Sequence, residues 1–405
     1  MVDLAILDWL TFLLRWVHVI TAIAWIGASF YFVWLDRSLR QPSDLSRGRG
    51  IQGELSAIHG GGIYLVGKYA SHPKPMPAEL HWFKWEAYST WLSGSVLMVF
   101  VYYLNADSYL LGSDTWFSTA APAIAFSIGY LLLALVLYEL LCRVALPVPG
   151  MAVVASAALL LLSWLAFQAF APRAAIIHFG AALATMMAAN VFMVIIPSQK
   201  AFIAAIDAGE VADINLAQKA KIRSTHNNYF TLPVLFCMLS NHAPFVFGHA
   251  YAWLFVVALS VVAAWARHYF NVKHTGVNKP SILVSAVVAW LLLIFVFAAT
   301  QQQKVFAYTP QRAQVQEIVT QHCANCHSRE PRFPGFQAAP GGFEFERPEQ
   351  LLRHRDVVRT SVQTHYMPLG NQTGMTDAER DLLLAFVQTD GPARVPVDAT
   401  ATPSD

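Results

Sequence analysis

The sequence predicts an all-α protein in two parts, a polytopic membrane helix bundle of about eight spans followed by a small soluble all-α domain. Two observations support this fold class. Apolar residues make up 56% of the 405 residues, and only 13% are charged. The charged residues are also unevenly placed, because long apolar runs fill the first three-quarters of the chain and the rest is polar. Runs of this length cross a hydrocarbon core of about 30 Å as helices.

Eight apolar runs are long enough to be membrane spans. They cover residues 10–35, 85–104, 120–141, 151–171, 174–197, 227–247, 250–267 and 282–300. Asp3 and Asp8 stand where a cleaved signal peptide would be basic, so we expect the first span to be retained. The lipid bilayer is therefore the expected surrounding of this part. The net charge of +2 gives no indication of nucleic acid binding.

Composition divides the chain into four segments. Residues 1–300 form the membrane domain, and residues 301–310 form a short linker. Residues 311–392 are rich in Pro, Gly, Arg and Glu, which is typical of a small soluble domain. We expect residues 393–405 to be a flexible tail, because chain ends of this composition are commonly frayed.

A Cys-x-x-Cys-His motif, "CANCH", lies near the start of the soluble domain. In a c-type cytochrome, Cys323 and Cys326 would form thioether bonds to haem and His327 would be the proximal iron ligand. A zinc site would need four ligands, and the other cysteines, Cys142 and Cys237, lie in distant apolar runs. A dithiol redox pair would need a βαβ context, which is absent. The motif therefore predicts one covalent haem c in an all-α class I cytochrome c domain.

The sixth iron ligand is expected from the segment "HYMPLGNQTGMTDAER". Met367 precedes a proline, which resembles the Met-Pro turn of small cytochromes c, and we predict it as the ligand. His365 is the alternative. Thr376 and Glu379 have the spacing of a capping box that begins the closing helix. Met375 precedes that cap, where a side chain more often packs as a hydrophobic staple.

The distribution of basic residues predicts the orientation. Lys and Arg gather in the loops after the first, third, fifth and seventh spans, whereas the opposite side holds only Arg15, Arg173 and Lys304. The positive-inside rule makes the basic side cytoplasmic, and eight spans then place both termini outside. The haem motif agrees, because c-type haem is attached on the periplasmic side in bacteria. We therefore expect a multi-pass protein of the bacterial inner membrane with a periplasmic cytochrome c domain.

Polar residues at the cytoplasmic side of the bundle form a candidate ligand site. His59 and Lys68 flank a triple glycine where the backbone can approach a ligand closely. His81 lies in the aromatic segment "HWFKWEAY", and the tryptophans there fit an interfacial belt. His226 and Asn228 lie in "STHNNYF" at the cytoplasmic end of the sixth span. The segment "RHYFNVKHTG" (267–276) ends the seventh span on the same side.

Histidines inside the predicted spans are the candidate ligands of a second haem. His18, His178 and His242 all lie in the outer half of the bundle by the predicted topology. Facing imidazoles at one depth bind b-type haem, with His18 as the first ligand and His178 or His242 opposite. The alternative is that each histidine hydrogen-bonds to a neighbouring helix or lies at the membrane interface.

Several long motifs resemble those of the bacterial integral-membrane urate oxidases, also called urate hydroxylases, which are fused to a cytochrome c. They are "RWVHVITAIAWIGASFYFVWLD", "IHGGGIYLVGKY", "LHWFKWEAYSTWLSG", "HNNYFTLPVLFCMLSNH", "CANCH" and "MPLGNQTGMTDAER". The resemblance covers essentially the whole chain. It implies oxidation of urate to 5-hydroxyisourate without hydrogen peroxide, since the electrons go to haem c and then to a periplasmic or membrane acceptor such as a terminal oxidase. The alternative is an electron-relaying cytochrome b/c subunit of a quinol-linked or other respiratory oxidoreductase.

The urate site is expected on the cytoplasmic side. Urate is a planar monoanion at neutral pH, so a lysine or protonated histidine binds it, and histidine is the usual general base. We therefore predict a site built from His59, Lys68 and His226, with His81 and Asn228 nearby. A cytoplasmic site and a periplasmic haem c lie on opposite faces of the bilayer core, which is why a haem b between them is expected.

Overall fold

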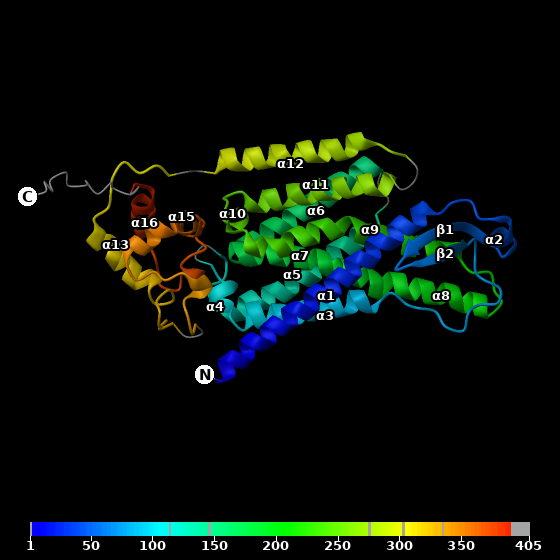
Figure 1. Ribbon diagram of the computed structural model, residues 1–405, viewed down its shortest axis with the longest axis horizontal. Coiled ribbons are helices and arrows are strands. Elements are labelled where there is room, and N and C mark those ends of the chain that lie inside the picture. The colour runs from blue at the N-terminus through cyan, green and yellow to red at the C-terminus, as the bar shows by residue number, and fades with distance from the viewer. Residues whose placement is uncertain are drawn as a thin grey trace, which may run out of the picture.

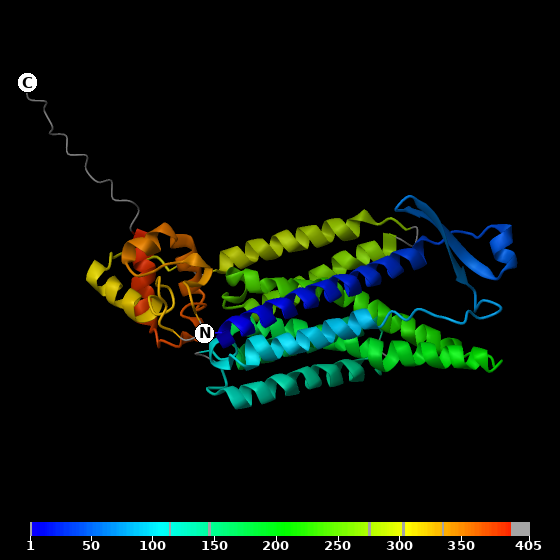
Figure 2. The same ribbon diagram turned by 60° about the horizontal axis from the view of Figure 1, so that its bottom comes forward.

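The computed structural model describes residues 2–389 apart from 113–114, 145–146, 274–276, 302–303 and 334–335. The predicted tail at 393–405 lies outside the described residues. Long helices run side by side along the molecule, with a helical C-terminal domain at one end and a β-hairpin at the other (Figure 1). The turned view shows the same order, and the N-terminus lies at the end that carries the C-terminal domain (Figure 2).

Long helices overlap all eight predicted runs. They are α1 (Val2–Ser38), α3 (Trp85–Met98), α5 (Ala120–Leu141), α6 (Val148–Ala169), α7 (Pro172–Ala189), α9 (Ile214–Leu239), α11 (Ala252–Lys273) and α12 (Pro280–Thr300). A π-helical turn, Val99–Tyr103, extends α3. Another, Asn190–Ile195, joins α7 to α8 (Ile196–Asp207).

Six helices in the described part of the chain are long and apolar enough to cross a membrane. They are Ile6–Ser38, Ala120–Leu141, Gly150–Ala169, Pro172–Asp207, Ala252–Lys273 and Pro280–Thr300. The other two predicted spans lie in α3 and α9. The regular part of α3 has 14 residues, and the first half of α9 carries the polar run "INLAQKAKIRSTHNN". Both helices nevertheless pack against the bundle, since α3 contacts α1 and α7, and α9 contacts α7 and α11.

The centre of the bundle is α7, which packs against α3, α5, α6 and α9. Ile176, Phe179 and Leu183 on α7 are buried in the main hydrophobic core. By contrast, large apolar side chains such as Leu132 and Phe295 are exposed on the bundle surface. An apolar exterior around a packed core is what a lipid environment requires.

A β-hairpin follows α1 and the short α2 (Asp44–Gly48), so the prediction of an all-α chain is wrong here. Strands β1 (Ile51–His59) and β2 (Gly62–Tyr69) are antiparallel. The connecting Gly60 and Gly61 have φ of 56° and 82°, which a two-residue hairpin turn requires and glycine adopts without strain. The triple glycine therefore turns the chain.

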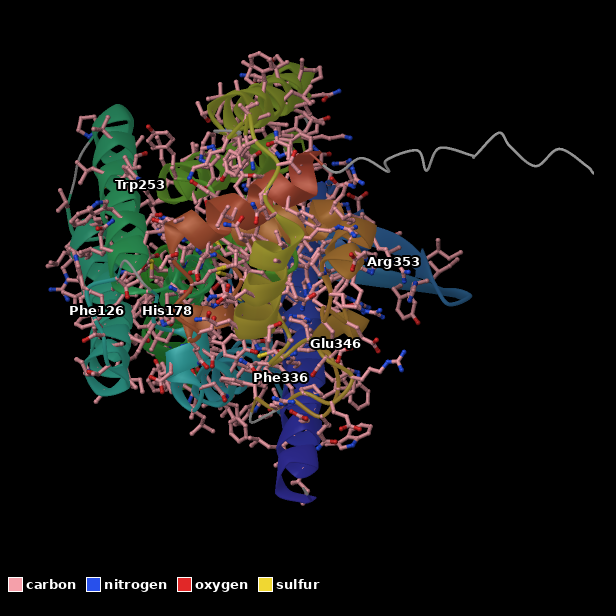
Figure 3. All side chains as sticks on the ribbon, turned by 90° about the vertical axis from the view of Figure 1, so that its left-hand side faces the viewer. Phe126, His178, Trp253, Phe336, Glu346 and Arg353 are labelled. Carbon is pink, nitrogen blue, oxygen red and sulfur yellow. The ribbon has the colours of Figure 1, made fainter. Side chains whose placement is uncertain are left out.

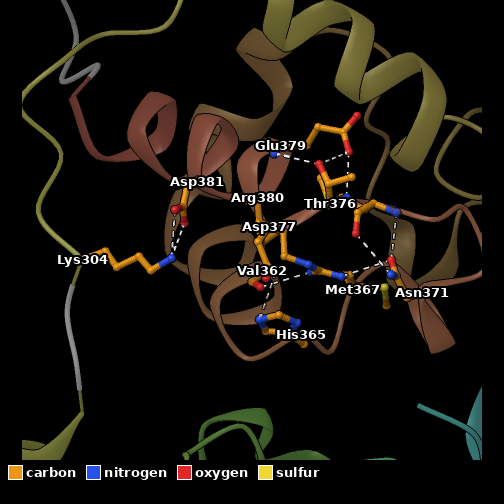
Figure 4. Close-up of polar contacts among 11 residues, drawn as sticks. Lys304, Val362, His365, Met367, Asn371, Thr376, Asp377, Glu379, Arg380 and Asp381 are labelled. Atoms are coloured by element: carbon orange, nitrogen blue, oxygen red, sulfur yellow. Dashed lines mark hydrogen bonds and ion pairs between the residues drawn. The ribbon is translucent and has the colours of Figure 1, made fainter. Parts of the chain in front are cut away.

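The C-terminal domain is built from α13 (Arg312–Ile318), α14 (Pro348–Arg353), α15 (Arg355–Gln363) and α16 (Asp377–Thr389). Its core is separate from that of the bundle and contains Val319, Leu351 and Phe386. The predicted capping box at the start of α16 is confirmed. The Thr376 backbone N–H donates to Glu379 Oε2 at 2.7 Å, and the Glu379 N–H donates to Thr376 Oγ1 at 3.3 Å (Figure 4).

Candidate functional site

The Cys-x-x-Cys-His motif lies on a tight turn at the end of a π-helical segment, Val319–Cys323. The His327 backbone N–H donates to the Cys323 carbonyl at 2.8 Å, which folds the motif into one turn. Burial raises the pKa of the Cys323 thiol to about 12, so this thiol stays protonated at neutral pH. The His327 ring uses Nδ1 for a 2.9 Å hydrogen bond with the Phe343 carbonyl. Its Nε2 has no hydrogen-bond partner in the described residues, which is the arrangement of an oriented metal-ligating histidine.

The two methionines of the predicted ligand segment have different surroundings. Met375 is buried in the core of the domain, as expected for a hydrophobic staple. Met367 is half-buried, and its carbonyl accepts a hydrogen bond from the Arg380 guanidinium (Figure 4). His365 is exposed on a positive-φ turn, 4.0 Å from Asp377. These positions favour Met367 over Met375 as a ligand.

The loop that carries Met367 contacts the membrane domain. A side-chain hydrogen bond joins Gln372 to Ser108 on α4 (Ala106–Tyr109). A Cβ added to Gly370 would lie 2.5 Å from the Asp107 carbonyl oxygen, so glycine allows this approach. We call the surface between this loop and the bundle the junction.

A second glycine allows the bundle and the C-terminal domain to approach each other closely at another point of the junction. A Cβ added to Gly248, which follows α10 (Pro244–Phe247), would lie 1.9 Å from the Thr364 Cβ. A cavity of about 130 Å³ lies in the junction, between Phe170 of the bundle and Tyr366 of the C-terminal domain. Arg173 lines it and donates to Tyr366 Oη at 3.2 Å and to Asn241 Oδ1 at 2.9 Å.

The hairpin separates two predicted urate ligands from the rest. His59 is exposed at the end of β1, next to the glycine turn. Lys68 on β2 forms an ion pair with Asp36 at the end of α1, and Lys221 pairs with the same carboxylate at 3.1 Å. His81 is also exposed, and its ring centroid lies 4.5 Å from that of Phe83. The contacts of His59, Lys68 and His81 therefore do not include His226 or Asn228.

His226 belongs to a polar network on one side of α9, which we call the Arg223 network (Arg223, Glu139, Asn190, Asn227, Tyr138 and His226). Arg223 makes a bidentate ion pair with Glu139 at 2.6 and 2.8 Å and donates to Asn190 Oδ1 at 2.9 Å. Asn190 donates to the Tyr138 hydroxyl and to Asn227 Oδ1, both at 2.8 Å.

The network continues to His226 and ends on backbone. The Tyr138 hydroxyl lies 2.9 Å from His226 Nδ1, and the Asn227 amide donates to the Met187 carbonyl at 3.0 Å. Nearly every polar group of the Arg223 network is thus paired, and its one buried charge has a carboxylate partner. A satisfied arrangement of this kind joins α5, α7 and α9 as a structural unit.

Asn228 faces the other side of α9, where it meets Arg267 of α11. The Arg267 Nε donates to Asn228 Oδ1 at 2.9 Å. The guanidinium carbon lies 3.8 Å from the ring centroid of Phe30 on α1. Asn271 lies one turn along α11 on the same face as Arg267. We call Arg267, Asn228, Asn271 and Phe30 the Arg267 cluster.

The three predicted haem b ligands have separate neighbours. His178 is fully buried, with Nδ1 2.8 Å from the Ala174 carbonyl and Nε2 2.7 Å from Ser127 Oγ, so both nitrogens are engaged. Figure 3 looks at the molecule from the C-terminal-domain end and labels His178 within the bundle. His242 is exposed. No group of three or more His, Cys, Asp or Glu side chains in the described residues could hold a metal ion.

His18 differs from the other two histidines because one ring nitrogen has no partner in the described chain. Its Nδ1 lies 3.1 Å from the Thr90 carbonyl and 3.0 Å from Ser93 Oγ, while Nε2 is not engaged. A Cβ added to Gly94 would lie 2.9 Å from the ring, so this glycine of α3 makes room for it. A pair of facing histidines is therefore absent among these three as arranged, and His18 alone keeps the geometry of a ligand.

Sequence reasoning missed three members of the Arg267 cluster. Arg267 and Asn271 lie in the segment 267–276, which the sequence analysis marked without assigning residues. Phe30 lies in a quoted motif of the first span but has no feature that separates it from other apolar residues. The spacing of Arg267 and Asn271 by four residues was the available signal, because it places both on one face of a helix.

A comparison with protein families gives one match. The model described as urate oxidase N-terminal matches residues 4–298. The match spans the membrane domain, including both sides of α9, and ends before the C-terminal domain. No curated protein and no solved structure matches the chain.

Proposed function

Because the chain belongs to the urate oxidase N-terminal family, we propose that it oxidises urate in the membrane domain and passes the electrons to a haem c in the C-terminal domain. Family membership supports an oxidoreductase that acts on urate. The six apolar helices fit a membrane location. The observation that carries the electron-transfer step is the "CANCH" turn, since it follows the membrane domain in the same chain and its Met367 loop contacts the bundle.

The reaction balances without oxygen as a direct acceptor. The urate monoanion and one water give neutral 5-hydroxyisourate, two electrons and one proton. The C–O bond forms from water to the purine ring, and the electrons leave the ring. No hydrogen peroxide forms, because oxygen receives no electrons at this site. A haem c held by this chain would take one electron at a time, so each turnover would need two transfers to a downstream periplasmic or membrane acceptor.

The C-terminal domain contains residues that fit a haem c. Cys323 and Cys326 would hold the porphyrin covalently, and His327 would present Nε2 to the iron. The carbonyl of Phe343 fixes the orientation of the His327 ring. Arg380 donates to the Met367 carbonyl, and this loop would offer the Met367 sulfur to the iron. When bound, the group supplies one-electron exchange near the junction.

The junction is the point where electrons would leave the bundle. The Met367 loop itself meets α4 through Gly370 and Gln372. These contacts support the proposal, because the same loop carries Met367. The close backbone approach at Gly248 and Gly370 favours fast transfer, since the rate of electron transfer falls steeply with distance.

A haem b at His18 remains a prediction. His18 would supply one ligand through its Nε2, and a haem b there would provide one-electron exchange within the bundle. Acid–acetone extraction removes haem b and leaves thioether-linked haem c behind. Active protein without extractable haem would rule the group out.

Anaerobic addition of urate to the oxidised, purified chain tests the proposed function. We expect urate alone to produce the absorption bands of reduced haem c. Xanthine, which lacks the oxygen at C8, is the matched control and should leave the spectrum unchanged. If urate also leaves the haem oxidised, the chain is an electron-relaying subunit that needs another donor, such as a quinol.

A further inference from the structure

Arg267 is a buried charge for which the described residues provide no counterion. Its residue is 8% exposed, and no carboxylate forms an ion pair with it in the part of the chain that the structure describes. Arg37, which acts on it electrostatically, has the same sign, and the other group that acts on it is the Tyr229 phenol. An uncompensated buried cation is strongly destabilising, so such a residue is retained where an anion completes the site.

Two amide side chains beside Arg267 have hydrogen-bonding groups without partners. Asn228 and Asn271 are each 1% exposed. Among the described residues, the Asn228 Nδ2 and both the Nδ2 and Oδ1 of Asn271 are buried and make no hydrogen bond. Leaving such a group unpaired costs about as much as the desolvation of the group itself, so buried amides normally have partners. Three orphaned atoms in one cluster therefore point to a missing polar ligand.

The orphaned groups define the chemistry of that ligand. The guanidinium offers N–H donors in a plane and favours an anion with paired acceptors. Asn228 adds a donor, whereas Asn271 adds both a donor and an acceptor. The matching ligand is a planar anion whose edge alternates carbonyl oxygens and ring N–H groups. The urate monoanion has this edge on both rings.

We propose that Arg267, Asn228 and Asn271 bind the urate anion between α9 and α11, with Phe30 holding the guanidinium in place from α1. This assignment rests on the proposed function. It keeps the predicted role of Asn228 and replaces His59, Lys68, His81 and His226 as binding residues. Arg267 lies 15 residues from the first residue of α11, roughly 22 Å along the helix from the end near α10 and the junction.

The position of Phe30 also relates this site to His18. Both residues are on α1, and His18 is 12 residues nearer to the end that carries the C-terminal domain, roughly 18 Å along the helix. His18 therefore stands between the Arg267 cluster and the junction. The cavity at the junction is the competing place for urate, because Arg173 lines it.

Binding of urate to the full-length chain after reduction with dithionite tests the assignment. The reduced protein cannot accept electrons, so equilibrium dialysis with radiolabelled urate measures binding without turnover. We expect Arg267→Gln to weaken binding roughly 10- to 100-fold, the loss of a charge-assisted hydrogen bond. Asn271→Leu should weaken binding by roughly 10-fold, since it removes the orphaned groups at similar volume. Arg173→Gln is the matched control and should leave binding unchanged.

Two outcomes would overturn the assignment. One is unchanged urate binding in both the Arg267→Gln and Asn271→Leu variants, which would mean that ordered water satisfies the orphaned amides. The other is a loss of binding in Arg173→Gln alone, which would place urate at the junction. The binding readout is separate from the proposed function, since urate can bind and still fail to reduce haem c. If the Arg267→Gln variant does not fold, urate binding to the Asn271→Leu variant decides the question.

Discussion

Each of the two sides of α9 meets a buried arginine, but the two arginines have different partners. Arg223 has Glu139 as its counterion, and the surrounding side chains complete a network of hydrogen bonds. In the part of the chain that the structure describes, Arg267 contacts Asn228 Oδ1 and the face of Phe30, beside amides with orphaned atoms. The first arrangement is complete in the protein itself. The second becomes complete only with an anion, so the comparison separates a structural charge from a substrate-binding charge.

The largest expected effect is on the structural side. Glu139→Leu leaves the buried Arg223 charge unpaired, and we expect the free energy of unfolding to fall by about 3 kcal/mol. Thermal unfolding of the detergent-solubilised protein measures this change. The double variant Arg223→Met with Glu139→Leu is the control, because removing both charges should restore most of the loss. A double variant as unstable as Glu139→Leu would show that the ion pair is not the cause.

The opposite result is expected for the substrate-binding side. Arg267→Met removes an uncompensated buried charge, so the free energy of unfolding without urate should stay constant or rise by about 1 kcal/mol. Saturating urate should raise the unfolding temperature of the wild-type chain but not that of the variant. A large loss of stability in Arg267→Met without urate would mean that Arg267 is structural, like Arg223.

Electron transfer out of the bundle can be tested by a substitution that touches neither the Arg223 network nor the Arg267 cluster. Gly248→Ala adds a Cβ that would lie 1.9 Å from the Thr364 Cβ, so the C-terminal domain must move away from the bundle. We expect haem reduction by urate to slow by roughly tenfold or more, while urate affinity stays constant. Gly129→Ala is the matched control, since no atom lies within 4 Å of the added Cβ. Equal rates in the two variants would rule out the junction as the exit.

The smallest effect is expected in the C-terminal domain. Hydrogen bonds from the side chain and backbone of Thr376 lower the pKa of Glu379. A carboxyl with a depressed pKa stabilises the domain above its unfolded pKa of about 4.3, and this contribution is lost as the pH falls through the folded pKa. Glu379→Gln should therefore reduce the acid-induced loss of stability by less than about 1 kcal/mol. A pH titration of thermal unfolding measures it, and parallel profiles would contradict this contribution of the Glu379 charge.

The sequence was informative where periodicity and local spacing decide the structure. Six of the eight predicted runs coincide with helices that are long and apolar enough to cross a membrane. The Thr376–Glu379 spacing correctly predicted the start of α16. The hairpin was not predicted, because the glycines Gly60 and Gly61 are equally compatible with a ligand-binding loop and with a turn.

Neighbours in the chain proved a poor guide to neighbours in the fold. His226 and Asn228 are two residues apart, yet the helical rotation sends them to opposite sides of α9. Arg267 and Asn228 are distant in the sequence and in direct contact. Whether a buried charge is paired depends on helix packing, and no local pattern in the sequence shows it.

A structure of the reduced protein with urate bound tests the central claim most directly. The account predicts planar density between α9 and α11, within hydrogen-bonding distance of Arg267, Asn228 and Asn271. The Arg223 network should be unchanged on the other side of α9. Density in the junction cavity beside Arg173, with the Arg267 cluster empty, would contradict the account.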